Sequence, residues 1–102
     1  MSFTPLQIQQ VWEKGTIVLG YDSSTWRKDV CTAWITRTEY GNPNSVYGWE
    51  IDLINPNGGD HLNNLRPLQW ENKAAKSEAR FCVVVSNTDR NIHIATPASR
   101  PL

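Results

Sequence analysis

The residues that could do chemistry are concentrated in the middle of the chain. They offer a carboxylate, an imidazole, two amides and an ammonium group: Asp52, His61, Asn64, Asn72 and Lys73. Carboxylate and imidazole groups bind divalent metal ions and transfer protons in hydrolytic sites. Two other residues of these types have less promising positions. Asp60 lies among turn formers and is interpreted as a turn residue, and His93 lies on a later strand candidate and is interpreted as structural.

The same segment contains the elements that must position these groups. Apolar and acidic residues alternate along residues 49–53, which predicts a half-buried strand. Turn formers fill residues 55–60 and end that strand. Residues 63–68 predict a short strand or a turn. Residues 69–76 predict a helix, because they are good helix formers and carry Trp70 on one face.

This segment resembles the HNH nuclease family, whose core is the ββα-metal fold. The matches follow the family's order and spacing: Trp49-Glu50-Ile51-Asp52, Gly58-Gly59, Asn64-Leu65-Arg66-Pro67-Leu68, Trp70, Asn72 and Lys76. Residues 11–15 and 26–29 are similar to segments that precede the motif in this subtype. The resemblance therefore covers about residues 8–78. It implies a small α+β single domain over residues 1–102, with an HNH-like core at about 47–78, an N-terminal helix and additional short β-strands.

Two positions depart from the family pattern. The resemblance implies hydrolysis of a phosphodiester by a His base and a divalent metal, with a middle Asn that orients the His. Asp52 stands at a metal-ligand position and Asn64 at the orienting position. Leu53 stands at the general-base position and cannot accept a proton. Lys73 stands at the second ligand position, and a protonated ammonium has no lone pair for a metal. Asp52 is therefore the only ligand position retained.

Alternatives remain open for the roles of these residues. Lys73 could replace the metal charge by pairing with Asp52, or it could simply point into solvent. Asn72 and His61 could substitute for the lost groups. Asn72, however, is about 100° away around the helix, and His61 is expected to be exposed. Asn64 has no His to orient, so we expect it to tie its loop through backbone hydrogen bonds.

Basic residues near the predicted helix could bind a partner. They are Arg66, Lys73, Lys76 and Arg80, with Arg27 and Lys28 as possible additions. The alternative is a solvated helix face on which Glu71 and Glu78 separate the cations. The formal net charge is zero, which argues against binding through overall attraction to phosphates and tilts the partner towards protein. Three aromatic residues could anchor such a partner if exposed: Tyr47, Trp49 and Trp70.

Three functions are compatible with these features. The favoured one is a catalytically degenerate HNH-like protein that binds a protein, such as a host defence or nuclease component, or DNA. A phage or mobile-element inhibitor would fit this description. The alternative is an active endonuclease with displaced ligands, which would use Mg²⁺, Mn²⁺, Ni²⁺ or Zn²⁺. An engineered inactive nuclease is the third, and the second departure at Lys73 argues against it.

The flanking sequence predicts a helix over residues 5–14, with Thr4 as its cap, and strands over residues 30–37, 80–85 and 92–95. The tail, residues 96–102, is expected to be irregular. The five Trp residues are expected mainly to fill the core. Cys31 and Cys82 are expected to be buried free thiols, because they are far apart and lack metal-binding spacing. The sequence contains no membrane-length apolar run or signal-peptide pattern, so a cytoplasmic protein is the default expectation.

Overall fold

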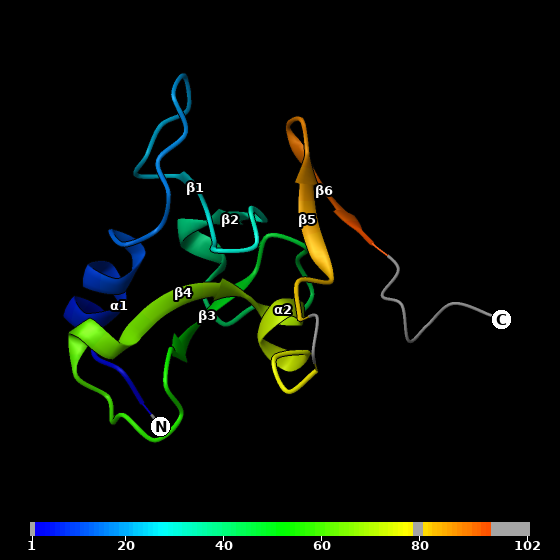
Figure 1. Cartoon of the computed structure of the whole chain (residues 1–102). Coiled ribbons are helices and arrows are strands. Elements are labelled where there is room, and N and C mark those ends of the chain that lie inside the picture. The colour runs from blue at the N-terminus through cyan, green and yellow to red at the C-terminus, as the bar shows by residue number, and fades with distance from the viewer. Residues whose placement is uncertain (1, 79–80, 95–102) are drawn as a thin grey trace, which may run out of the picture.

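The architecture is a small α+β arrangement of two helices and three antiparallel strand pairs, and Figure 1 shows its elements in chain order. The computed structural model describes residues 2–78 and 81–94. Arg80 and the predicted tail, residues 96–102, lie outside the described residues. No helix in the described ranges is long and apolar enough to cross a membrane.

The N-terminal helix α1, Pro5–Trp12, begins as its sequence predicts. Thr4 Oγ1 accepts a hydrogen bond from the backbone N–H of Gln7, and Gln7 Oε1 accepts one from the backbone N–H of Thr4. This capping box, with Pro5 at the first helical position, fixes the start of the helix. The helix ends at Trp12, two residues before the predicted end.

The central hairpin consists of β3, Trp49–Leu53, and β4, Leu65–Gln69. Their antiparallel register places Asp52 opposite Arg66 and Leu53 opposite Leu65. A short 3₁₀ turn, η2 (Leu62–Asn64), precedes β4, and helix α2 (Trp70–Ala74) follows it without a loop. The predicted strand and helix are confirmed. The segment that could have been a strand or a turn contains both.

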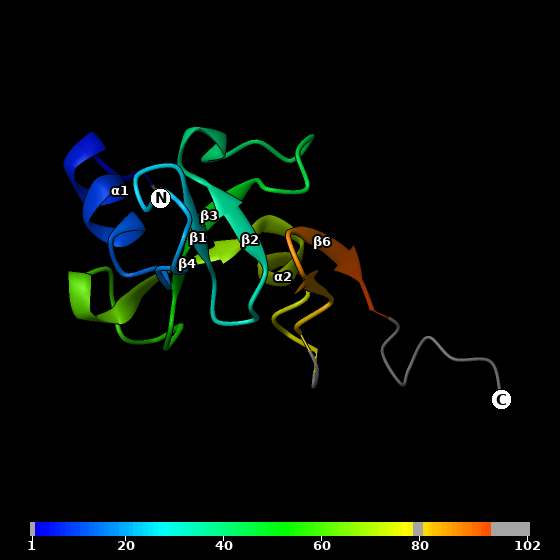
Figure 2. The ribbon, with the colours of Figure 1, turned by 90° about the horizontal axis from the view of Figure 1, so that it is seen from above.

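Two shorter hairpins complete the sheet structure. Strand β1, Trp26–Lys28, pairs with β2, Trp34–Thr36, and a second 3₁₀ turn, η1 (Arg37–Glu39), follows β2. Strand β5, Val84–Asn87, pairs with β6, Arg90–His93. Figure 1 and Figure 2 place α1 and the β5–β6 hairpin at opposite ends of the molecule.

The strand predicted over residues 30–37 is wrong in its first half. Asp29 Oδ1 accepts hydrogen bonds from the backbone N–H groups of Cys31 and Ala33, and Thr32 adopts a φ of 65°. A side chain that caps nearby N–H groups competes with strand pairing and folds the segment into a turn. Only the end of the predicted strand therefore pairs, as β2.

The core lies between α1, β2 and the central hairpin. Its buried cluster comprises Val11, Trp12, Ile35, Trp49, Ile51 and Leu65. Trp12, Trp34 and Trp49 are each at most 2% exposed, which confirms the expectation that most Trp residues fill the core. Trp26 and Trp70 are half-buried.

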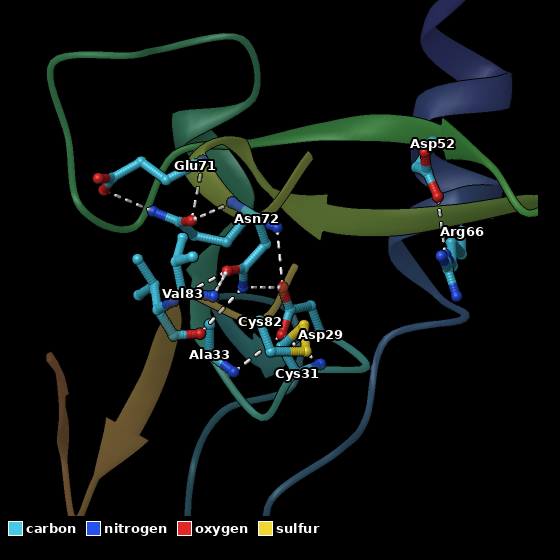
Figure 3. Close-up of a disulfide and its surroundings, with 11 residues drawn as sticks. Asp29, Cys31, Ala33, Asp52, Arg66, Glu71, Asn72, Cys82 and Val83 are labelled. Carbon is cyan, nitrogen blue, oxygen red and sulfur yellow. Dashed lines mark hydrogen bonds and ion pairs between the residues drawn. A yellow bond between two sulfur atoms is a disulfide. The ribbon is translucent and has the colours of Figure 1, made fainter. Parts of the chain in front are cut away.

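The expectation of free thiols is wrong. Cys31 and Cys82 form a disulfide, with Cα atoms 5.3 Å apart, across 51 residues of sequence (Figure 3). The spacing along the chain gave no sign of this pairing, because it depends on two long-range hydrogen-bonding side chains, Asp29 and Asn72. These bring the turn at residues 29–33 against the segment that enters β5.

Candidate functional site

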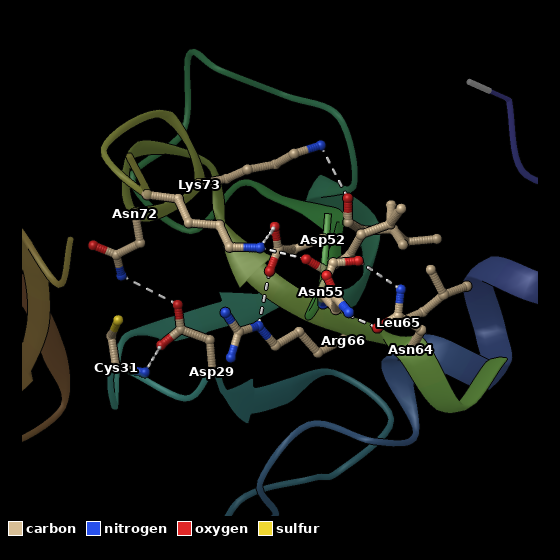
Figure 4. A network of polar contacts seen from close by, with 12 residues as sticks. Asp29, Cys31, Asp52, Asn55, Asn64, Leu65, Arg66, Asn72 and Lys73 are labelled. Carbon is tan, nitrogen blue, oxygen red and sulfur yellow. Dashed lines mark hydrogen bonds and ion pairs between the residues drawn. The ribbon is translucent and has the colours of Figure 1, made fainter. Parts of the chain in front are cut away.

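The carboxylate of Asp52 is the centre of the candidate site, and two cations already hold it (Figure 4). Its side chain, on β3, is only 4% exposed. Arg66 Nε, from the opposite strand β4, donates to Oδ2 at 2.8 Å, and Lys76 Nζ, from the turn after α2, donates to Oδ1 at 3.0 Å. Each carboxylate oxygen therefore has its own charged donor, and together these contacts join β3, β4 and the end of α2.

Of the two alternatives for Lys73, the ion pair with Asp52 is not formed. Lys73 Nζ instead donates to the backbone carbonyl of Ile51 at 2.9 Å and lies 3.5 Å from Glu50 Oε1. The helix places Lys76, rather than Lys73, over the Asp52 carboxylate. Lys73 is not simply solvated either, because its contact with the Ile51 carbonyl ties α2 to β3.

Leu53 belongs to the packing of the domain. It lies opposite Leu65 in the central hairpin, and its half-buried side chain packs against the core cluster. Its backbone carbonyl accepts a hydrogen bond from Lys76 Nζ. The position at which the family resemblance places a general base therefore holds a hydrocarbon side chain that contributes to the core.

Asn64 ties its loop, as predicted. Its Oδ1 accepts a hydrogen bond from the backbone N–H of Asn55 at 2.9 Å (Figure 4). Its Nδ2 donates to the carbonyls of Asn55 at 2.9 Å and Gly59 at 2.7 Å. A Cβ added at Gly58 would lie 2.8 Å from Asn64 Nδ2, so this close approach explains the glycine.

The two residues considered as substitutes have different surroundings. Asn72 is fully buried, and its Oδ1 accepts hydrogen bonds from the backbone N–H groups of Val83 and Val84 (Figure 3). Its Nδ2 donates to Asp29 Oδ2 at 3.2 Å and to the Val84 carbonyl at 2.9 Å. Asn72 thus joins α2 to β5. His61 is exposed at the start of η2, as expected.

Within residues 2–78 and 81–94, no group of three or more His, Cys, Asp and Glu side chains is arranged to hold a metal ion. The donor chemistry near Asp52 also does not fit one. A metal cation would have to displace Arg66 and Lys76 from the carboxylate. A divalent metal requires oxygen or imidazole lone pairs, which these side chains do not supply.

Asp29 is a structural centre that the sequence reasoning did not single out. In addition to the two N–H groups of its own turn, it accepts hydrogen bonds on Oδ2 from the backbone N–H of Gln69 at 2.9 Å and from Asn72 Nδ2. Burial raises the pKa of the Asp29 carboxyl above its ordinary value of 3.8, and the hydrogen bond from Gln69 is the largest opposing effect. One sequence feature could have drawn attention to Asp29: it ends residues 26–29, the segment that is similar to one preceding the motif in the HNH subtype.

Four of the basic residues proposed to bind a partner already contact acceptors of the protein. Arg27 is buried, with Nε donating to the carbonyl of Ser23 at 2.9 Å and Nη1 donating to the carbonyls of Glu13 at 3.0 Å and Gly15 at 3.2 Å. These bonds hold the end of α1. Three other cations lie around Asp52 and Glu50: Arg66, Lys73 and Lys76.

The remaining candidates for partner contacts also differ in exposure. Lys28 places its ammonium 4.7 Å from the centre of the Trp34 ring. Trp49 is fully buried and cannot anchor a partner. Tyr47 and Trp70 are half-buried, and Trp70 Nε1 donates to the carbonyl of Ser45.

Comparisons with protein-family models, curated proteins and solved structures give no match to this chain.

Proposed function

We propose that this chain is a catalytically degenerate HNH-like protein that acts by binding another protein. The observation that carries the proposal is the state of Asp52, whose two oxygens are held by Arg66 Nε and Lys76 Nζ. In the HNH resemblance this carboxylate would hold a metal. Here it pairs with two cations and joins a strand–strand–helix unit.

The positions expected to supply the rest of the chemistry support the same proposal. Leu53 has no proton to exchange, and loss of a general base alone typically costs about 10²–10⁴-fold in rate. The side-chain amides of Asn64 and Asn72 form hydrogen bonds with backbone groups. The side chains that resemble the family's site therefore stabilise the scaffold.

A protein partner is favoured over DNA by the way the cations are used. Arg27 is buried against backbone carbonyls, Asp52 pairs with Arg66 and Lys76, and Glu50 lies beside Lys73. Pairing reduces the charge that could neutralise phosphates, and the formal net charge is zero. The kind of partner proposed is a host defence or nuclease component, with the chain acting as a phage or mobile-element inhibitor.

The disulfide bears on where the protein acts. Cytosolic thiols are kept reduced, so a stable disulfide is typical of oxidising compartments. The Cys31–Cys82 pair therefore weighs against the cytoplasmic location expected from the sequence, and the proposed partner is then one that acts where disulfides persist.

The catalytic part of the proposal is tested by plasmid nicking with Mg²⁺, Mn²⁺, Ni²⁺ and Zn²⁺ in turn. We expect no nicking by the natural chain and no change in its melting temperature with a chelator. The matched control is Asp52→Asn, which removes the one retained ligand charge. Nicking by the natural chain that disappears in Asp52→Asn would establish the active nuclease instead.

The binding part of the proposal is tested by measuring duplex DNA affinity as a function of salt. We expect affinity no tighter than ordinary non-specific binding, for which Kd is about 10⁻⁴–10⁻⁶ M at physiological salt. Nanomolar DNA binding that weakens in Lys73→Met would refute a protein partner and establish a DNA-binding module.

A further inference from the structure

A hollow of about 250 Å³ lies between the end of α1, strand β1 and strand β4. Its wall includes Lys14 and Thr16, which follow α1, and Arg66 and Pro67, which belong to β4. The hollow adjoins the Asp52 cluster through Arg66, which contributes to both. The proposed function assigns no role to this hollow.

The guanidinium of Arg66 is the group in the wall best able to bind a ligand. Its Nε is occupied by Asp52 Oδ2 at 2.8 Å. No hydrogen-bond acceptor for Nη1 or Nη2 is found among the residues that the structure describes, and the side chain remains 21% exposed. Figure 4 shows the guanidinium held by Asp52 at one edge, with its other nitrogens directed away from that carboxylate. The centre of the Phe81 ring lies 5.7 Å from the guanidinium carbon.

This arrangement pre-organises a donor fork. The ion pair with Asp52 fixes the guanidinium plane, so less side-chain freedom is lost when a ligand binds. Two parallel N–H donors match the two oxygens of a phosphate or carboxylate group, and such charge-assisted bidentate pairs are about twice as strong as neutral hydrogen bonds.

The charges around the hollow favour an anion. Lys14 Nζ donates to the backbone carbonyls of Leu62 and Leu65, which fixes a second positive charge at the wall. The acidic residue of the wall is Asp29, whose carboxylate oxygens already accept four N–H donors. Both of its oxygens are therefore engaged by donors of the protein, and Lys14 and Arg66 outnumber its single negative charge in the wall.

We propose that this hollow binds a phosphate group through the Nη atoms of Arg66, and that Asp52 acts as the positioning residue for that guanidinium. The inference does not depend on the HNH resemblance or on the proposed protein partner. The carboxylate that in a nuclease would hold a metal serves here to orient an arginine. The phosphate could belong to a free phosphate compound or to a nucleic-acid backbone, and the experiment separates these sources.

The test is a titration of the natural chain with inorganic phosphate. Binding is measured by calorimetry and by the chemical shifts of the backbone amides. We expect saturable binding, with shift changes at Gly15 and Thr16. Arg66→Lys can still pair with Asp52 but loses the fork, and it should weaken phosphate binding about tenfold or more. The matched control is Lys76→Met, which removes the other cation from Asp52 without altering the wall and should change the affinity less than threefold.

The positioning role of Asp52 has its own readout. Asp52→Asn should weaken phosphate binding several-fold, whereas Lys76→Met, which also removes an ion pair from this cluster, should not. If the two variants lower affinity in proportion to their loss of melting temperature, Asp52 has only a structural role and this part of the inference is overturned.

Competition identifies the source of the phosphate. A deoxynucleoside monophosphate that displaces inorganic phosphate, with no competition from a short DNA duplex, establishes a free phosphate compound. Competition by the duplex that Arg66→Lys abolishes establishes a backbone phosphate. Absence of saturable binding at millimolar phosphate, or equal affinities in the natural chain and Arg66→Lys, refutes the site.

Discussion

Removing the disulfide should destabilise the native state strongly without changing its fold. The perturbation is the double substitution Cys31→Ala and Cys82→Ala. The two cysteines are 51 residues apart, and a crosslink over a loop of that length stabilises the native state by about 4 kcal/mol, mainly by restricting the unfolded chain. The unfolding entropy of a domain of this size is about 0.2 kcal/mol/K, so the melting temperature should fall by about 20 °C.

The fold should survive because other contacts hold the C-terminal hairpin in place. Trp34 Nε1 donates to the carbonyl of Thr88, and Asn91 Nδ2 donates to the carbonyls of Trp34 and Val46. His93 Nε2 lies 2.6 Å from Glu71 Oε2. Circular dichroism below the transition should therefore be nearly the same with and without the crosslink.

The assay is thermal and urea unfolding of the natural chain with and without a dithiol reductant. The double Cys→Ala variant serves as the control, and reductant should not affect it. Two free thiols per native chain, or melting temperatures of the oxidised and reduced chains that agree within error, would refute the reasoning.

Two further predictions concern the buried polar side chains. Asn64→Ala removes three loop hydrogen bonds and should lower the free energy of unfolding in urea by about 2–3 kcal/mol. Asn57→Ala, in the same loop but exposed, should cost less than about 0.5 kcal/mol, and equal losses would contradict the assigned role of Asn64. Burial raises the pKa of Asp29 above 3.8, so its native carboxyl binds a proton more tightly than the unfolded one does. Its contribution to stability is then complete below pH 3.8 and declines as the pH rises through the native pKa. A carboxyl titration by NMR with a midpoint at or below 3.8 would show that the hydrogen bonds outweigh burial.

The features predictable from the sequence were those set by local patterns. The alternation in residues 49–53 gave β3, the cap at Thr4 gave the start of α1, and the turn formers of residues 55–60 gave the loop that Asn64 ties. Each depends on residues that are close together in the chain.

The features that were missed depend on contacts between distant segments. The disulfide requires Asp29 and Asn72 to bring two segments together across 43 residues of sequence. The partner of Asp52 could not be chosen from spacing alone, because Lys73 and Lys76 both follow β4 within two helical turns. Only the packing of α2 against β3 determines that Lys76 contacts the Asp52 carboxylate and that Lys73 contacts the Ile51 carbonyl.

The most direct test of the central claim, that Asp52 holds cations of the protein rather than a metal, is a titration with paramagnetic Mn²⁺ monitored by amide resonances. We predict no selective broadening of the amides of residues 51–53 and 73, because Arg66 and Lys76 occupy both Asp52 oxygens. Saturable broadening confined to those amides and abolished by Asp52→Asn would contradict the account and identify a metal site.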